Sequence, residues 1–166
     1  MKSKTTNIKP EQAASNKIKQ ENERITLQFA EKFLQATKLN ATLATNMSLC
    51  TDDEHSGVIF KLPYSGFWFN DISFITDGDF ARVDYSRAIA YSNEELLERA
   101  DLVSTLRKIA NNADYKFEQL SLVGNQSKGI CMAKTVHLDN YQEFAEAIGS
   151  IDRLISLYIG DTRQGK

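Results

Sequence analysis

Two aspartates are the residues whose type and spacing could best support catalysis. If two strands pair across a tight turn at Asp77-Gly78, Asp71 lies opposite Asp84, and two close carboxylates raise the pKa of one of them. Such a pair could transfer protons or bind a metal ion. Arg82 falls on the same predicted sheet face, however, and can compensate these charges diagonally. We therefore assign no catalytic residue and keep a metal-dependent enzyme using Asp71 and Asp84 as an alternative.

Other reactive residue types lack the spacing that a site needs. The acids of residues 52–54 beside His55 do not alternate as in a calcium-binding loop, so a solvated turn is expected there. The glycine-containing segment 124–129 lacks the Lys-Ser/Thr ending of a phosphate loop. Cys131 and His137 lie about 20 Å apart in an extended strand, too far for a nucleophile and its base. The sequence therefore predicts no metal site and no cofactor.

Length and composition indicate one globular domain. The chain has 166 residues, of which 42% are hydrophobic and 25% charged, and these proportions exclude collagen-like and wholly disordered classes. Lys plus Arg number 20 and Asp plus Glu number 22, so the net charge of −2 argues against nucleic acid as a partner. No run approaches the roughly 18 apolar residues that cross a bilayer, and Cys50 and Cys131 are expected to stay reduced in the core. We expect a soluble cytoplasmic protein that binds no membrane.

Charge and apolar spacing divide the chain into three parts. Residues 1–20 are a polar, basic lead-in that is expected to be partly disordered or an exposed helix. Residues 21–160 are expected to form a single α+β domain, and residues 161–166 a frayed tail. Any site is therefore expected within the middle part.

Apolar stripes predict three helices in this domain. Apolar residues recur every three or four positions over residues 25–40, which predicts the first helix. A capping-box pattern over residues 92–95 starts the second, and Asp139 is expected to cap the last. The expected buried stripes of the second and last helices are Leu96, Ala100, Val103, Leu106 and Ala110, and Phe144, Ile148, Ile151, Ile155 and Tyr158.

Between the first two helices the apolar period changes to two, and β-branched and aromatic residues dominate. This block is predicted to hold strands at residues 46–50, 58–62 and 67–76, and a strand that returns after Asp77-Gly78. A further hairpin is expected over residues 117–138. The elements together predict a two-layer α+β fold with an antiparallel sheet, in the order helix, strand block, helix, β-hairpin, helix.

The Asp77-Gly78 turn predicts which residues share a sheet face. In a type I′ turn these two residues occupy the central positions, so Thr76 lies opposite Asp79 and the faces follow by alternation. One face is expected to be core: Trp68, Asn70, Ile72, Phe74, Ala81, Val83 and Tyr85. The other face combines polar and charged residues with four apolar ones: Phe67, Phe69, Ile75 and Phe80. These four are predicted to bind a partner, unless a helix of the same chain covers them.

The element order and two segments resemble a known fold. The segments are residues 67–74 with Asp77-Gly78-Asp79-Phe80, and the passage from residues 106–112 into Lys116-Phe117. This pattern resembles the class I type III secretion chaperones and the YbjN-type regulators of sensory transduction. The resemblance implies a small, acidic, non-enzymatic protein, often a homodimer, that holds another polypeptide. It implies no catalytic residue.

The function expected from these observations is protein binding. We expect a non-enzymatic module, chaperone-like or regulatory, that holds another polypeptide or a second copy of itself through the apolar sheet face. An immunity or anti-toxin-type inhibitor is an alternative, because an equally small and acidic protein could mask a basic toxin surface. The metal-dependent enzyme remains the second alternative.

Overall fold

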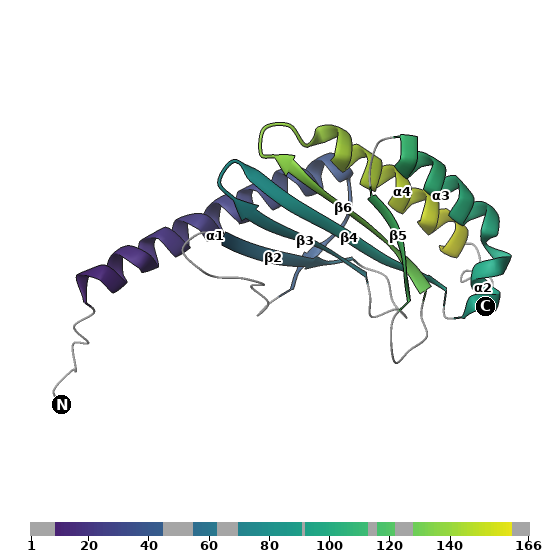
Figure 1. Ribbon diagram of the computed structural model, residues 1–166, viewed down its shortest axis with the longest axis horizontal. Helices are drawn as coiled ribbons and strands as arrows, with labels where there is room; N and C mark the ends of the chain where they lie inside the picture. The colour runs from purple at the N-terminus through teal and green to yellow at the C-terminus, as the bar shows by residue number, and fades with distance from the viewer. Residues whose placement is uncertain are drawn as a thin grey trace, which may run out of the picture.

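The chain folds as helices layered on one antiparallel sheet (Figure 1). The computed structural model describes residues 9–44, 55–62, 70–90, 92–112, 116–121 and 128–160. These ranges contain four helices and six strands: α1 (Pro10–Thr37), β1 (Thr42–Leu43), β2 (His55–Lys61), β3 (Asn70–Asp77), β4 (Phe80–Ala90), α2 (Asn93–Glu98), α3 (Ala100–Asn112), β5 (Lys116–Ser121), β6 (Lys128–His137) and α4 (Gln142–Gly160). The strands pair antiparallel in the order β1-β2-β3-β4-β6-β5. The predicted α+β class with an antiparallel sheet is confirmed.

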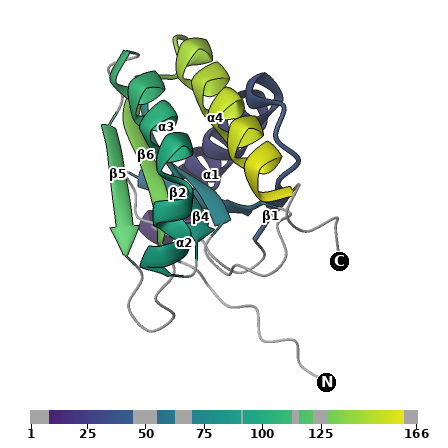
Figure 2. The same cartoon turned by 90° about the vertical axis from the view of Figure 1, so that its right-hand side faces the viewer.

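α1, α3 and α4 lie on the same side of the sheet, as Figures 1 and 2 show from two directions, while α2 lies at the end of the sheet next to β4. α1 packs against β2 and β3, α4 packs beside α1 and over β4, and α3 packs beside α4. The opposite face of the sheet carries no helix from the described part of the chain. This second face is therefore the candidate binding surface.

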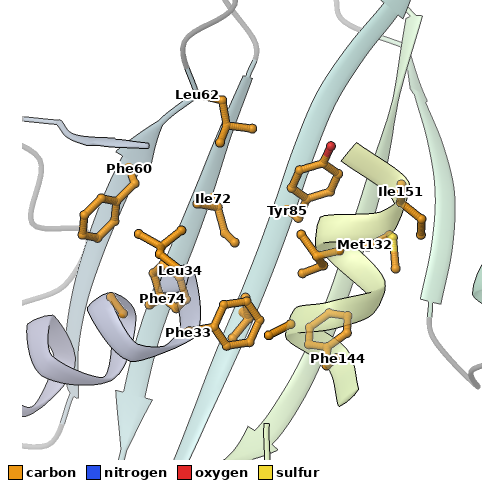
Figure 3. Close-up of a cluster of buried hydrophobic side chains, with 14 of the residues drawn as sticks. Phe33, Leu34, Phe60, Leu62, Ile72, Phe74, Tyr85, Met132, Phe144 and Ile151 are labelled. Atoms are coloured by element: carbon orange, nitrogen blue, oxygen red, sulfur yellow. The ribbon is translucent and has the colours of Figure 1, made fainter. Parts of the chain in front are cut away.

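Aromatic side chains join the helices to the sheet (Figure 3). The ring centroid of Phe33 in α1 lies 5.3 Å from that of Phe74 in β3 and 6.0 Å from that of Phe144 in α4. Such edge-on pairs add about 0.5–1.5 kcal/mol each to the free energy gained by burial. The predicted core residues that are buried in the structure are Phe29, Phe33, Ile72, Phe74, Val83, Leu106, Phe144, Ile148, Ile151 and Ile155. Trp68 lies outside the described residues.

α1 is a single helix that begins well before its buried stripe. Pro10 occupies the first turn, where its missing N–H costs nothing. The first turns of the helix extend beyond the sheet (Figure 1), and burial begins at Thr26. The helix ends at Thr37, earlier than expected, because Lys38 adopts the left-handed conformation with a φ of 60°.

The β3–β4 turn differs from the prediction by one residue. Gly78 and Asp79, rather than Asp77 and Gly78, are the central residues, and Asp77 pairs with Phe80. Gly78 has a φ of 56°, and it is the only described glycine with a positive φ. A type II′ turn requires a positive φ only at its first central residue, so Gly78-Asp79 meets this requirement and Asp79 need not adopt the strained conformation of a type I′ turn. The predicted pairing of Asp71 with Asp84 is therefore wrong.

The same correction leaves the two faces unchanged. Each residue of β3 pairs with a β4 residue two positions further along than predicted, and two positions is one full period of a strand. The predicted core face is confirmed for its described members, which are all buried: Asn70, Ile72, Phe74, Ala81, Val83 and Tyr85.

The second predicted helix is two helices. Its capping box is confirmed, since Ser92 accepts from the Glu95 N–H and Glu95 accepts from the Ser92 N–H. The helix is interrupted at Arg99, where α2 ends and α3 begins. Of the predicted stripe, Leu106 is buried, Leu96 and Val103 are partly buried, and Ala100 is exposed. Leu102, which was not predicted, is buried as well.

Three other predictions also need correction. Residues 55–57 belong to β2 instead of a turn, since Ser56 pairs with Thr76 and Gly57 pairs with Ile75 of β3. Asp139 does not cap α4, which begins at Gln142; its N–H donates instead to His137 Nδ1 at 3.1 Å, in a tight turn after β6. Tyr158, expected in the buried stripe, is 50% exposed. The predicted strand at residues 46–50 lies outside the described residues.

Of the helices in the described ranges, none has the length and apolar character needed to cross a bilayer.

Candidate functional site

The candidate site is the sheet face turned away from the helices, which we call the open face. Its residues alternate along each strand with the core residues, and cross-strand partners share a face. On the three strands nearest the β3–β4 turn, the open face consists of Gly57, Ile59 and Lys61 of β2, Asp71, Ser73, Ile75 and Asp77 of β3, and Phe80, Arg82, Asp84 and Ser86 of β4.

The exposed part of the open face lies near the β3–β4 turn. Along β4 the exposed fraction falls from 52% at Phe80 to 8% at Ser86. Ile75 is partly buried and Ile59 is buried. Of the four predicted partner-binding residues, the structure therefore places Ile75 and Phe80 on this face, while Phe67 and Phe69 lie outside the described residues.

Phe80 is an exposed aromatic held in place by a neighbour. Its ring packs edge-on against the imidazole of His137 on β6, with ring centroids 5.3 Å apart. His55, Asp77, Phe80 and His137 are successive cross-strand partners, so they form one row across four strands. Three strand spacings of about 4.8 Å separate the two histidines, too far for both to bind one metal ion.

Charged residues on the open face are paired within the face. Lys61 Nζ lies 3.2 Å from Asp71 Oδ2, and Arg82 donates to both carboxylate oxygens of Asp84 at 2.9 Å. The predicted compensation by Arg82 is thus confirmed for Asp84, and Asp71 has a different cation. Exposed pairs of this kind contribute about 0–1 kcal/mol to stability. A ligand on this face would therefore meet charged pairs next to apolar side chains such as Ile75.

Nothing in the described ranges gathers three or more His, Cys, Asp or Glu side chains in a way that could hold a metal ion. Asp71 and Asp84 share the open face without facing each other: Asp71 pairs with Ser86, and Asp84 pairs with Ser73.

A buried polar cluster joins β4 to α4 on the helix side of the sheet. Arg87 Nη1 donates to Asp152 Oδ1 at 2.8 Å, to the Asp152 carbonyl oxygen at 3.0 Å and to Ser156 Oγ at 3.1 Å. The Tyr85 hydroxyl donates to the same Oδ1 at 2.6 Å. Arg87 and Asp152 are 2% and 3% exposed, so this ion pair is fully inside the protein. Burial raises the pKa of Tyr85 well above its ordinary value, and the nearby Asp152 carboxylate acts in the same direction.

The sequence contains a signal for this cluster, namely charged residues at core positions of α4 and β4. Asp152 stands four residues after Ile148 and three before Ile155, which places a carboxylate within the buried stripe of α4. Arg87 stands two residues after Tyr85 on the core face of its strand. Opposite charges at two core positions of neighbouring elements predict a buried pair, because an unpaired buried charge is costly.

Comparisons with known proteins identify no family. No family model matches the chain, and no curated protein matches it. Among solved structures, the chain is similar to an uncharacterized protein from Methanothermobacter thermautotrophicus, with 12% sequence identity and a TM-score of 0.45. The similarity covers 82% of this chain and 98% of that protein. A likeness of this degree identifies neither a family nor an activity.

Proposed function

We propose that the protein is a non-enzymatic polypeptide-binding module, chaperone-like or regulatory, that holds another protein against its open face. The observation that carries the proposal is the one-sided arrangement of the layers. The helices α1, α3 and α4 pack on one face of the sheet, and Phe80 is 52% exposed on the other. An aromatic side chain of this size in water favours a partner that covers it.

The chemistry of the open face suggests the kind of segment that it binds. Phe80 and Ile75 provide apolar contacts, and the pairs Lys61–Asp71 and Arg82–Asp84 lie beside them. A bound segment would need an apolar side chain over Phe80 and polar side chains of both signs next to it. This description fits an extended or helical segment of another protein better than a small molecule, because these residues are spread over three neighbouring strands.

The resemblance to type III secretion chaperones and YbjN-type regulators agrees with this proposal. The resemblance implies a non-enzymatic protein that holds another polypeptide. No observation on the described residues specifically favours the immunity-type inhibitor or the metal-dependent enzyme, so we propose neither as a second function.

Site-specific photocrosslinking tests the proposal. A photoreactive phenylalanine analogue replaces Phe80 in one variant and Leu157 in a matched variant; Leu157 is 65% exposed, but it lies on α4 in the helix layer. In extract of the cells that naturally make the protein, we expect a discrete protein adduct from position 80 and none from position 157. The same adducts from both positions, or adducts from position 157 alone, would contradict binding at the open face.

A further inference from the structure

Both histidines of the chain lie in one row of the sheet, and the exposed Phe80 lies between them. His55 on β2 pairs with Asp77, which pairs with Phe80 on β4, and Phe80 pairs with His137 on β6. Histidine is the side chain whose charge normally changes between about pH 5 and 8. A segment that covers Phe80 therefore meets neighbours whose charge depends on pH.

A hydrogen bond fixes which nitrogen of His137 carries the proton. Nδ1 accepts from the Asp139 N–H at 3.1 Å, so the ring is neutral and holds its single proton on Nε2. The same turn is joined to the β3–β4 turn, because the Leu138 N–H donates to the Asp79 carbonyl oxygen at 2.9 Å. The imidazole that packs edge-on against Phe80 is thus held in place by the backbone of two adjoining turns.

Protonation of His137 is incompatible with this hydrogen bond. A proton on Nδ1 would face the proton of the Asp139 N–H, and two donors cannot bond to each other. The imidazolium therefore has to turn until its Nδ1–H finds an acceptor, and this rotation changes the edge-on contact with Phe80. Protonation thus alters the support of Phe80 and adds a positive charge beside it.

Acceptors for a rotated imidazolium lie in the same row and in the two turns. The charged residues near His137 are Asp139 on its own turn, Asp79 in the β3–β4 turn, Asp77 on β3 and Arg82 on β4. β5 pairs with β6 no further than Ala133, so it does not reach this row. Arg82 is already paired with Asp84, whereas the other three are exposed carboxylates that can accept from Nδ1–H.

His55 provides the contrast within the same row. Its Nε2 lies 3.6 Å from Asp77 Oδ2, so the group that it faces there is a carboxylate rather than an N–H. A carboxylate can pair both with the N–H of a neutral ring and with an imidazolium. Protonation of His55 therefore keeps this contact, whereas protonation of His137 breaks its bond to Asp139.

We propose that His137 makes binding at the open face depend on pH: the partner binds while the imidazole is neutral and is released when it becomes protonated. This inference rests on the proposed function of the open face. A segment that covers Phe80 also takes water away from the adjoining ring, and burial disfavours an imidazolium more than a neutral imidazole. Binding then requires the loss of one proton, so the affinity falls by up to about tenfold for each pH unit below the range in which the ring titrates.

Nuclear magnetic resonance of the free, full-length protein tests the switch itself. As the pH falls from about 8 to about 5, the Asp139 amide proton and the Phe80 ring signals are expected to shift with the same midpoint as the His137 imidazole. His137→Asn offers an amide oxygen as the acceptor and cannot titrate, so these shifts should be absent from it. His55→Asn is the matched control, in which they should persist.

Photocrosslinking with the phenylalanine analogue at position 80 tests the effect on binding. In extract adjusted to about pH 7.5 or about pH 5.5, the yield of the protein adduct is expected to be about fivefold or more lower at the acidic pH. The His55→Asn background should show the same loss. The His137→Asn background should give equal yields at both pH values, which also shows that titration of the partner is not the cause.

The results that contradict the two claims differ. Equal yields at both pH values in the wild-type background, or the same acidic loss in His137→Asn, would overturn the inference and leave the proposed function intact. An Asp139 amide that does not follow the titration of His137 would overturn the inference as well. The absence of any adduct from position 80 at either pH would contradict the proposed function and this inference together.

Discussion

Tyr85 couples the stability of the protein to alkaline pH. Its hydroxyl is buried, and burial raises its pKa above the value of about 10 that it has in the unfolded chain. Below that pH both states hold the proton, so the full stability is present. As the pH rises above it, the unfolded state releases the proton while the folded state keeps it, and the free energy of unfolding falls by about 1.4 kcal/mol per pH unit until the folded pKa is reached.

Urea unfolding at several alkaline pH values measures this effect. In Tyr85→Phe, the free energy of unfolding is expected to fall less steeply with pH, because one fewer proton is released on unfolding. In the wild type, tyrosinate absorbance should show one phenol that ionises only when the protein unfolds. Equal slopes in the two proteins would show that Tyr85 ionises freely in the folded state.

Asp152 is expected to be essential for stability even though it lies in no active site. Asp152→Asn leaves the buried guanidinium of Arg87 without its carboxylate, which typically costs about 3–5 kcal/mol. Asp71→Asn removes the carboxylate of an exposed pair and should cost less than about 1 kcal/mol. Chemical denaturation of both variants checks the contrast. Similar losses in the two variants would mean that the Arg87–Asp152 pair is not the buried connection between β4 and α4 that the structure shows.

At the scale of elements, α1 and α4 meet at a glycine. A Cβ added to Gly149 of α4 would lie 2.3 Å from the Thr37 carbonyl oxygen at the end of α1. Gly149→Ala should therefore destabilise the protein by about 1–3 kcal/mol, despite the better helix propensity of alanine. The neighbouring substitution Ser150→Ala is the control, since Ser150 is exposed. Thermal unfolding would contradict the close helix contact if Gly149→Ala were as stable as the wild type or more stable.

The elements also show how far the pattern of residues predicts the fold. The pattern of residues predicted the described helices and strands except the two-residue β1, but it merged α2 and α3 into one helix. It assigned the faces of β3 and β4 correctly. The turn was misplaced because Asp77-Gly78 and Gly78-Asp79 both fit a tight hairpin, and only the backbone φ values distinguish them. On α3 the prediction was correct at Leu106 but did not include Leu102, which is also buried.

At the scale of the whole molecule, the sequence predicted the two residues of the candidate site that the structure describes, Ile75 and Phe80, while Phe67 and Phe69 lie outside the described residues. Alternation alone placed Ile75 and Phe80 on one sheet face. Whether that face is open depends on where three helices pack, which is a long-range property that no local pattern contains. The ion pairs across the open face and the buried cluster at Arg87 join residues far apart in the sequence, so they depend on which strands are neighbours and on where α4 packs.

The central claim is that another polypeptide binds at the open face, and the dissociation constant of a Phe80→Ser variant for the protein captured at that position tests it most directly. Burial of a whole Phe side chain contributes about 1.5–3 kcal/mol, and Phe80 is 52% exposed in the free protein, so its loss should weaken binding by about three- to tenfold. The melting temperature should fall only slightly, because Phe80 is half exposed in the free protein and loses only its edge-on contact with His137. The matched variant Leu157→Ser, on the helix layer, should bind like the wild type. If Phe80→Ser binds as tightly as Leu157→Ser, the open face is not the binding surface.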